Sequence, residues 1–252
     1  MQMNDHLVSV ITPAYKAEKT IAETIRSVQA QTYPDWEMLV VDDGSPDGTA
    51  GVVAQFALED PRVRLIRQAN AGPAMARQAA LEQARGRYVA FLDSDDLWLP
   101  EKLARQLEFM SQYQAAISYT SFRRIRADGS GAGHRIRIPA RLTYRQLLGN
   151  TALATSTVLI DRALTGDFQM TKTYYDDFVL WLEILKRGHV ALGLNEDLMR
   201  YRVMGLSVSR NKGRSARMVW GTYREIERLS LPVSAFHFVR YAVNAWRKYR
   251  TF

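Results

Sequence analysis

Short apolar runs rich in β-branched residues alternate with stretches of helical periodicity over the first 113 residues, and this alternation restricts the possible folds most. The runs predict strands and the stretches between them predict helices. The predicted strands are Leu7–Thr12, Trp36–Val41, Arg62–Ile66 and Tyr88–Leu92, and the predicted helices cover residues 18–31, 47–58, 73–85 and 100–113. Near-continuous apolar strands joined by helices favour a mostly parallel sheet covered on both faces. We therefore predict a doubly wound, Rossmann-like α/β fold.

The second half of the chain has a weaker pattern. Ala116–Arg126 and His134–Ile138 flank a turn at residues 128–131 and predict a hairpin. Three further elements are predicted: a short helix capped by Thr143 and ending at Leu148, a strand Ser156–Ile160 and a helix Asp177–Lys186. Residues beyond 210 are expected to be helical.

Polar clusters follow the first, second and fourth predicted strands. In open parallel sheets, ligands bind outside the carboxyl ends of the strands, so these clusters are expected to converge on one edge. The strongest cluster is Asp93-Ser94-Asp95-Asp96. Carboxylates so close together repel one another unless a cation lies among them, and Mg²⁺ or Mn²⁺ takes oxygen ligands of this kind. Capping of the following helix is the alternative, but it accounts for one aspartate rather than three.

Three weaker clusters have structural alternatives that stay open. Asp42-Asp43-Gly44-Ser45 suits a ribose or base contact, or an Asx turn in which Gly44 takes a positive φ. Arg77, in the cluster Asn70–Arg77, suits a phosphate contact or a solvated helix surface. Asp177 and Trp181 share a helical face. Asp177 is therefore either a helix cap or a general base in an aromatic-walled pocket.

Several classes of protein are disfavoured by what the sequence lacks. With 0 Cys there are no disulfides, zinc–thiolate sites or cysteine nucleophiles. There is no G-x-x-x-x-G-K-[ST] phosphate loop, no G-x-G-x-x-G fingerprint and no G-x-S-x-G elbow. The first residues have no apolar h-region, so we expect no secretory signal, and the apolar stretches are too short to span a bilayer.

The positive charge is concentrated at the C-terminus. The chain has 34 Lys and Arg against 26 Asp and Glu, and 10 basic but only 2 acidic residues follow position 209, which leaves 24 of each in residues 1–209. Residues 235–250 predict a basic amphipathic helix, with His237, Arg240, Asn244, Arg247 and Lys248 on one stripe and Phe238, Ala242, Ala245, Trp246 and Tyr249 on another. Such a helix suits an anionic membrane surface, and docking on the body of the protein is the alternative.

Seven motifs occur in a fixed order: Val8–Tyr15, Ser27–Tyr33, Val40–Ser45, Asn70–Gln78, Gly86–Asp96, Asp177 with Trp181, and Tyr201–Lys212. This ordered set, covering about residues 7–212, resembles glycosyltransferase family 2, the large inverting group with a GT-A fold, of the kind that builds bacterial cell-surface glycans. Three positions depart from the family pattern, where Asp176 replaces Glu, Lys16 replaces Asn and Gln78 replaces Asn. The shorter Asp176 weakens any acceptor contact expected there.

The resemblance implies roles for particular residues. Pro13, Ala14 and Tyr15 would line the nucleotide pocket, Asp43 would read the base, and Arg77, Asp93 and Ser94 would contact the donor. Asp95, with Asp93, would hold Mn²⁺ or Mg²⁺ at the diphosphate, and Asp177 would be the catalytic base. The loop 207–212 is expected to close over the diphosphate.

The implied reaction is transfer of a sugar from a nucleoside-diphosphate-sugar to an acceptor hydroxyl. A UDP-sugar is the expected donor because uridine donors are commonest in the family, and a polyprenyl-linked or growing surface glycan is the expected acceptor. Two rival functions are a sugar-phosphate nucleotidyltransferase and a non-catalytic basic protein that binds membrane or nucleic acid. Residues 12–19 lack the Gly-rich basic loop of the first rival, and intact Asp93, Asp95 and Asp177 argue against the second.

We expect a catalytic domain over residues 1–212, with a nucleotide-binding half (1–113) and an acceptor-binding half (114–212). A basic helical extension is expected over 213–252. The resemblance and the tail together imply a cytoplasmic protein that is peripheral at the inner face of the plasma membrane, with no nucleic-acid partner.

Overall fold

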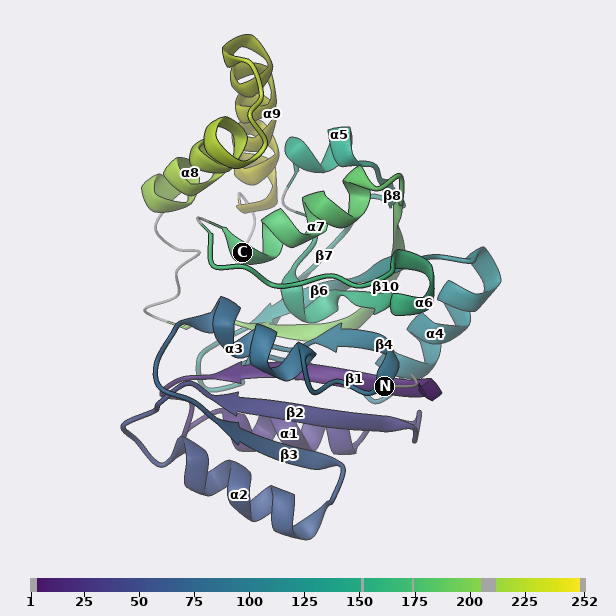
Figure 1. Ribbon diagram of the computed structural model, residues 1–252, viewed down its shortest axis with the longest axis vertical. Coiled ribbons are helices and arrows are strands. Elements are labelled where there is room, and N and C mark those ends of the chain that lie inside the picture. Colours follow the sequence, from purple (N-terminus) through teal and green to yellow (C-terminus); the bar gives the residue numbers. More distant parts are fainter. Residues whose placement is uncertain (1–3, 151, 174, 205–211, 250–252) are drawn as a thin grey trace.

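The computed structural model describes residues 4–150, 152–173, 175–204 and 212–249, and its centre is one large sheet (Figure 1). The strands are β1 (Asn4–Ala14), β2 (Trp36–Asp42), β3 (Val63–Arg67), β4 (Gly86–Phe91), β5 (Leu97–Trp98), β6 (Ile117–Ile125), β7 (Ala132–Ile136), β8 (Arg141–Leu142), β9 (Leu159–Asp161) and β10 (Ala191–Arg202). The helices are α1 (Ile21–Gln29), α2 (Thr49–Glu59), α3 (Pro73–Leu81), α4 (Lys102–Tyr113), α5 (Tyr144–Leu148), α6 (Arg162–Thr165), α7 (Asp176–Lys186), α8 (Lys212–Gly221) and α9 (Leu231–Tyr249). A 3₁₀ turn, η1 (Thr155–Thr157), precedes β9, and a π-helical turn, η3 (Thr222–Ile226), follows α8.

The first half of the sheet has the predicted parallel arrangement. The strand order is β3-β2-β1-β4, and β1 pairs in parallel with both β2 and β4. Alternate residues of each strand enter two cores. In β2, Leu39 and Val41 pack with α3 and α7, whereas Met38 and Val40 pack with α1 and α2. Helices therefore cover both faces of the sheet, and the predicted α/β fold is confirmed.

The second half of the sheet mixes strand directions. The hairpin predicted around residue 129 is confirmed as β6 and β7, which pair antiparallel. β9 lies antiparallel between β4 and β6, while β10 runs parallel to β6 and antiparallel to β5 and β8. The long strand β10 and the short β5 were not predicted. Two register shifts in β10, one on each side of Asp197, interrupt the periodicity that a sequence pattern needs.

The prediction of a strand over Ser156–Ile160 is wrong in its first residues. Both the amide and the hydroxyl of Thr157 donate to the carbonyl oxygen of Ala154, at 2.9 and 2.6 Å, and form the 3₁₀ turn η1. The strand β9 therefore begins only at Leu159, and the side chain of Ser156 is free to turn toward the residues that follow β4.

The C-terminal helices α8 and α9 pack against each other, and α9 contacts α5, at the opposite end of the molecule from α2 (Figure 1). Docking involves His237 and Tyr241, which are buried, and Asn244, whose side-chain amide donates to the carbonyl oxygen of Gly149 at 2.6 Å. The predicted stripes of this helix are therefore partly wrong. His237 and Asn244 face the body, whereas Trp246, predicted on the same stripe as the half-buried Phe238, is 60% exposed. The side chains of Arg247, Lys248 and Tyr249 lie outside the described residues.

Candidate active site

The three aspartates that follow β4 have different surroundings. Asp93 has a side chain that is 33% exposed and accepts a hydrogen bond from Nη2 of Arg77 at 2.6 Å. Asp96 is buried and accepts from Oγ of Ser156 at 2.6 Å and from the amide of Arg202 at 2.9 Å. Within the described part of the chain, no other side chain donates to the carboxylate of Asp95. The carboxylate of Asp96 is thus already hydrogen-bonded within the fold, so Asp93 and Asp95 are the two candidates for contact with a ligand.

Asp95 lies where a negative charge is unfavourable. Burial and the charge of Asp93 raise the pKa of Asp95 to about 6, although the positive charge of Arg202 opposes this. A divalent cation shared by Asp93 and Asp95 would offset this repulsion, so an all-oxygen metal site of the Mg²⁺ or Mn²⁺ type fits these residues. Nowhere in the described ranges do three or more His, Asp or Glu side chains form a metal cluster, and further ligands would have to come from a bound diphosphate or water.

Arg77 connects these aspartates to α7. It is 8% exposed, and although burial lowers the pKa of its guanidinium, the charges of Asp93 and Asp177 raise it by more. Its Nε atom is buried and has no hydrogen-bond partner among the described residues. A buried guanidinium with a donor unused suits an anionic ligand such as a phosphate. Of the two alternatives for this residue, the structure excludes the solvated helix surface.

Asp177 lies in the first turn of α7. Its carboxylate accepts from Oγ1 of Thr155 and, at 2.7 Å, from the amide of Phe178. Burial raises the pKa of Asp177, and Arg77 together with these two donors partly offsets the rise. A carboxyl group with a raised pKa in a protected position has the properties of a general base, and its amide contact also serves as a helix cap.

A small cavity of about 20 Å³ adjoins Asp177, which is room for roughly one water molecule. Its lining is mostly apolar and aromatic: Leu147, Asn150, Leu153, Tyr175, Asp177, Phe178 and Trp181. Trp181 packs edge-on against Phe91 of β4 at a centroid distance of 5.3 Å, and its buried Nε1 has no partner within the described ranges. The predicted pocket with aromatic walls beside Asp177 is therefore present.

The residues predicted for the nucleotide lie at the carboxyl end of β1 and β2. Pro13 and Ala14 end β1, and Tyr15 just beyond them is 47% exposed. Asp43 is joined to Ala14 through its amide, and its carboxylate accepts from the amides of Ala71 and Gly72, both at 2.8 Å, and from Gln68 at 2.7 Å. Asp43 therefore organises the loop before α3, and base reading by Asp43 stays a prediction.

The turn after β2 is the predicted Asx turn. The amide of Ser45 donates to Oδ1 of Asp42 at 3.2 Å, and Gly44 has a φ of +68°. A Cβ at Gly44 would also come within 2.9 Å of the amide nitrogen of Asn70. Glycine is required here both for the backbone conformation and for the close approach of the two loops.

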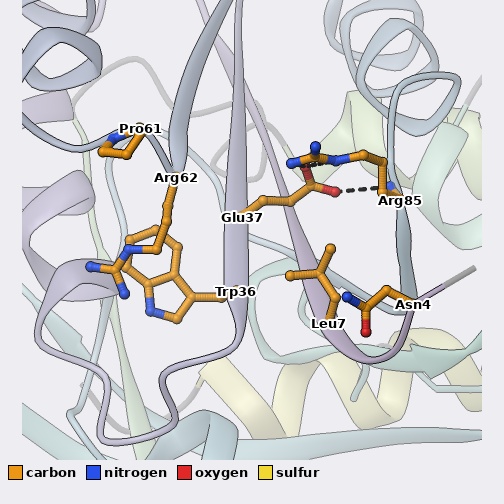
Figure 2. Close-up of a pocket in the computed structure, with 7 residues that line it drawn as sticks. All are labelled: Asn4, Leu7, Trp36, Glu37, Pro61, Arg62 and Arg85. Atoms are coloured by element: carbon orange, nitrogen blue, oxygen red, sulfur yellow. Dashed lines mark hydrogen bonds and ion pairs between the residues drawn. The ribbon is translucent and has the colours of Figure 1, made fainter.

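A larger cavity of about 420 Å³ lies at the opposite edge of the sheet, at the amino ends of the parallel strands (Figure 2). The one carboxylate in its lining, Glu37, is already bonded to Oγ of Ser9 at 2.8 Å and to Arg85 at 2.8 and 2.9 Å. Its charge is thus neutralised within the fold, and the cavity brings together none of the predicted site residues.

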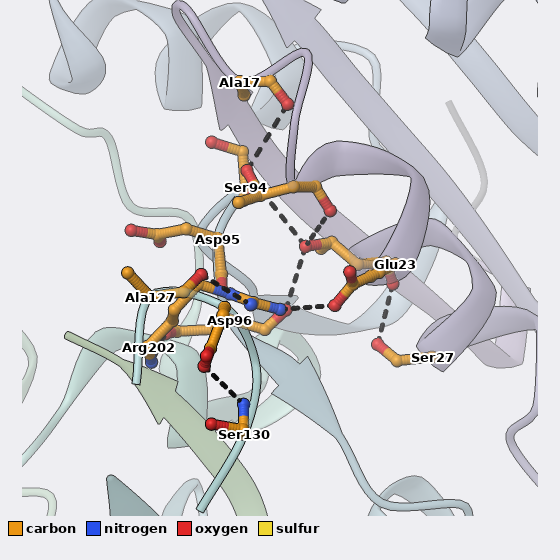
Figure 3. Close-up of polar contacts among 12 residues, drawn as sticks. Ala17, Glu23, Ser27, Ser94, Asp95, Asp96, Ala127, Ser130 and Arg202 are labelled. Carbon is orange, nitrogen blue, oxygen red and sulfur yellow. Dashed lines mark hydrogen bonds and ion pairs between the residues drawn. The ribbon is translucent and has the colours of Figure 1, made fainter. Parts of the chain in front are cut away.

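Several residues that organise the site were not predicted. Thr155 and Ser156 of η1 bond to Asp177 and Asp96, respectively, and Ser156 also accepts from the amide of Asp93 at 3.0 Å. Glu23 and Arg202 form an ion pair beside Asp95 and Asp96 (Figure 3). Arg202 belongs to the last of the family-like motifs, which was its only signal. Of the predicted loop at 207–212, residues 207–211 lie outside the described residues.

The chain is similar to known proteins of one family. The family model "Glycosyl transferase family 2" matches residues 9–174, more than half of the chain. The chain is 46% identical over 244 residues to TuaG of Bacillus subtilis (strain 168), a glycosyltransferase assigned to teichuronic acid biosynthesis, and the match covers 96% of this chain and 97% of TuaG. It is 39% identical over 220 residues to the Escherichia coli UDP-Glc:α-D-GlcNAc-diphosphoundecaprenol β-1,3-glucosyltransferase WfgD, with 86% and 85% covered.

Solved structures share the fold. Staphylococcus aureus TarS 1–349 in complex with UDP-GlcNAc has a TM-score of 0.71 and 19% identity, with 98% of this chain and 73% of that chain covered. The mannosyltransferase PcManGT from Pyrobaculum calidifontis, in complex with GDP-Man and Mn²⁺, has a TM-score of 0.68 and 19% identity, with 97% and 76% covered. The sheet, the ordered motifs and the two close relatives lead to one conclusion: the chain belongs to glycosyltransferase family 2 and has the GT-A fold.

Proposed function

We propose that this protein is an inverting, metal-dependent glycosyltransferase that moves a sugar from a UDP-sugar to a hydroxyl of a polyprenyl-diphosphate-linked glycan. The observation that carries the proposal is the position of Arg77, which bonds to Asp93 and lies within the electrostatic influence of Asp177. Asp93, one of the two aspartates proposed to hold a cation, and the candidate base Asp177 thus both interact with one buried arginine.

On the donor side, residues 1–113 supply the groups that would hold the nucleotide-sugar. Asp93 and Asp95 would hold Mn²⁺ or Mg²⁺, an ion that supplies neutralising charge to a leaving diphosphate. Arg77, whose buried Nε–H has no partner among the described residues, would donate to a phosphate oxygen. Tyr15, at the exposed end of β1, would contact the nucleoside.

On the acceptor side, residues 114–212 supply Asp177. Its carboxylate would take the proton of the attacking acceptor hydroxyl, and the hydroxyl of Thr155 together with the amide of Phe178 holds the carboxylate in position. Direct attack on the anomeric carbon, with loss of the nucleoside diphosphate from the opposite side, is a single displacement and inverts the anomeric centre. Positioned general bases contribute about 10²–10⁴-fold to such rates.

The donor and acceptor classes rest on the relatives. WfgD uses UDP-Glc and an undecaprenyl-diphosphate-linked GlcNAc, by its name, and TarS was crystallised with UDP-GlcNAc. The test is release of UDP from a panel of UDP-sugars in the presence of Mn²⁺ and a GlcNAc-diphospho-lipid, with the anomeric configuration of the product determined by NMR. Retention of configuration would contradict the inverting mechanism. Formation of a nucleotide-sugar from a nucleoside triphosphate would instead support the nucleotidyltransferase alternative.

The same proposal includes peripheral attachment to an anionic membrane through α9, in the C-terminal extension 213–252. Phe236, Val239, Val243 and Trp246 recur at helical spacing and are 59, 63, 42 and 60% exposed, respectively. Arg240 is exposed on the same helix, and the extension has 8 basic and 2 acidic residues, or +6 of the chain's net charge of +8. An apolar stripe with aromatic residues and neighbouring cations fits the interface of an anionic bilayer. No described helix has the length and apolar character needed to cross a membrane.

Membrane binding is expected to depend on this exposed stripe. The double variant Phe236→Gln/Trp246→Gln should lower binding to vesicles that contain phosphatidylglycerol by at least about tenfold, because burial of each large side chain contributes roughly 1.5–3 kcal/mol. Vesicle flotation measures the change. Leu58→Gln on α2, which replaces a side chain that is 83% exposed at the other end of the molecule, is the matched control. Equal flotation of the double variant and the wild type would contradict this attachment.

A further inference from the structure

Arg202, the last residue of β10, is only 2% exposed and connects three parts of the chain. Its Nε donates to the carbonyl oxygen of Asp95 at 2.8 Å, and its Nη2 donates to Oε2 of Glu23 on α1 at 2.5 Å. Its Nη1 donates to the carbonyl oxygen of Ala127, in the turn between β6 and β7, at 3.1 Å. Figure 3 shows the guanidinium between Glu23 and the backbone of Asp95. One side chain therefore links α1, the β6–β7 turn and the candidate metal loop.

The loop after β4 is held at consecutive residues. The carbonyl oxygens of Ser94 and Asp96 lie 3.1 and 2.9 Å from Oγ1 of Thr24 and share its single proton, and that of Asp95 accepts from Arg202. The amide of Arg202 also donates to Oδ1 of Asp96 at 2.9 Å. With its backbone held on this side, Asp95 extends its carboxylate away from the Glu23–Arg202 pair (Figure 3). Arg202 is thus one of the groups that hold the backbone of Asp95 and Asp96.

The turn between β6 and β7 approaches Arg202 closely. Gly129 has a φ of +81°, and a Cβ on it would lie 3.0 Å from Nη1 of Arg202 and 3.6 Å from Oε2 of Glu23. This turn therefore helps to bury the guanidinium of Arg202, while Glu23 stays half exposed. Desolvation of a guanidinium is costly, and one acceptor at each of the three nitrogens offsets part of that cost.

We propose that Arg202 is a positioning residue for the cation–diphosphate site, which fixes the backbone of Asp95 so that its carboxylate is presented to the metal. This inference rests on the proposed metal role of Asp95 and adds to it a dependence on β10 and α1. Residues that orient metal ligands without touching the metal typically change metal affinity by about 10–100-fold when they are replaced.

The test is to measure the affinity for Mn²⁺ in the presence of UDP, using the EPR signal of free Mn²⁺ to determine how much of the ion is bound. Arg202→Lys cannot reach all three acceptors and should weaken Mn²⁺ binding by about tenfold or more, with UDP affinity in the absence of metal unchanged. Glu23→Gln keeps an acceptor but removes the ion pair, and should shift the affinity in the same direction by a smaller factor. Because Glu23 is half exposed, this second variant decides the question if Arg202→Lys does not fold.

Arg123→Lys is the matched control, because Arg123 pairs with Asp197 at 2.6 Å and links β6 to β10 without touching the loop after β4. It should leave the Mn²⁺ affinity unchanged. A folded Arg202→Lys that binds Mn²⁺ as the wild type does, even with a lower Tm, would mean that Arg202 is merely structural and would overturn the inference. Failure of the wild type itself to bind Mn²⁺ with UDP would instead contradict the proposed metal role on which the inference rests.

Discussion

Replacement of Asp177 by Asn is expected to lower the rate of sugar transfer by about 10²–10⁴-fold, the usual contribution of a positioned general base. The amide oxygen of Asn can still accept from the amide of Phe178, so the start of α7 and the pocket beside it should persist. Donor binding should also persist, because Asp93 and Asp95 are unchanged. The result should therefore be a loss of turnover with the thermal shift by UDP and Mn²⁺ retained.

Glu183→Gln on the same helix is the control for Asp177→Asn. Its carboxylate is 49% exposed and pairs with Arg187 on the side of α7 that meets solvent, so its loss should change turnover little. An Asp177→Asn variant with more than a third of the wild-type rate would show that another group accepts the proton.

The pH profile of the wild type provides an independent check on the same residue. Burial raises the pKa of Asp177, and a base must be ionised to act. Activity should therefore be full above that raised pKa and fall as the pH decreases through it, at a higher pH than an ordinary carboxyl would give. The profile of the residual activity of Asp177→Asn, measured over the same range, should lack this acidic limb. An acidic limb that survives in the variant would assign it to a different group.

The first half of the fold could be predicted because local pattern and tertiary structure agree there. The central strands β1 and β2 are buried over most of their length, so their apolar residues form near-continuous runs, as in Trp36–Val41. β10 could not be predicted in this way, since its register shifts break the alternation and its side chains range from buried to exposed. In the tail, helical spacing correctly indicated a helix, but spacing alone does not say which face docks. The contacts of α9 with α5, η3 and α8 decided that.

The same division holds for the site. Asp93 and Asp95 could be singled out because clustered carboxylates at a strand end stand out in a sequence, whereas Asp177 was assigned as the base only through the resemblance to the family. Glu23, Ser156 and Arg202 look ordinary, and only the topology brings them to the loop after β4. β9 lies next to β4, and β10 pairs with β5 immediately after that loop, which carries Ser156 and Arg202 to the same aspartates. Pairing between strands that are far apart in the sequence does not change the local hydrophobic pattern, so it could not be predicted from that pattern.

Asp95→Asn is expected to abolish metal-dependent nucleotide binding and, in the same protein, to stabilise the ligand-free fold. The first effect follows because the substitution removes the charged ligand that Asp93 alone cannot replace. The second follows from the pKa of Asp95, which is raised from 3.8 to about 6 in the folded state by burial and by Asp93. Between these two values the folded protein binds more protons than the unfolded chain, so ionisation of Asp95 lowers the free energy of unfolding as the pH rises.

The stabilising effect should accordingly be absent below about pH 4, grow through the window between the two pKa values, and be complete above about pH 7. Its size is roughly 1–3 kcal/mol from the shift in pKa, which corresponds to about 2–4 °C in Tm for each kcal/mol in a chain of this length. Thermal unfolding at pH 5 and pH 8, with and without UDP and Mn²⁺, measures both effects together. Asp167→Asn, at a carboxylate that is 94% exposed, should change neither Tm nor the ligand response. If Asp95→Asn kept the shift produced by UDP and Mn²⁺, Asp95 would not be a metal ligand. If Asp95→Asn lowered the ligand-free Tm at pH 8, the ionised carboxylate of Asp95 would stabilise the fold. That result would contradict the argument that repulsion between Asp93 and Asp95 favours a bound cation.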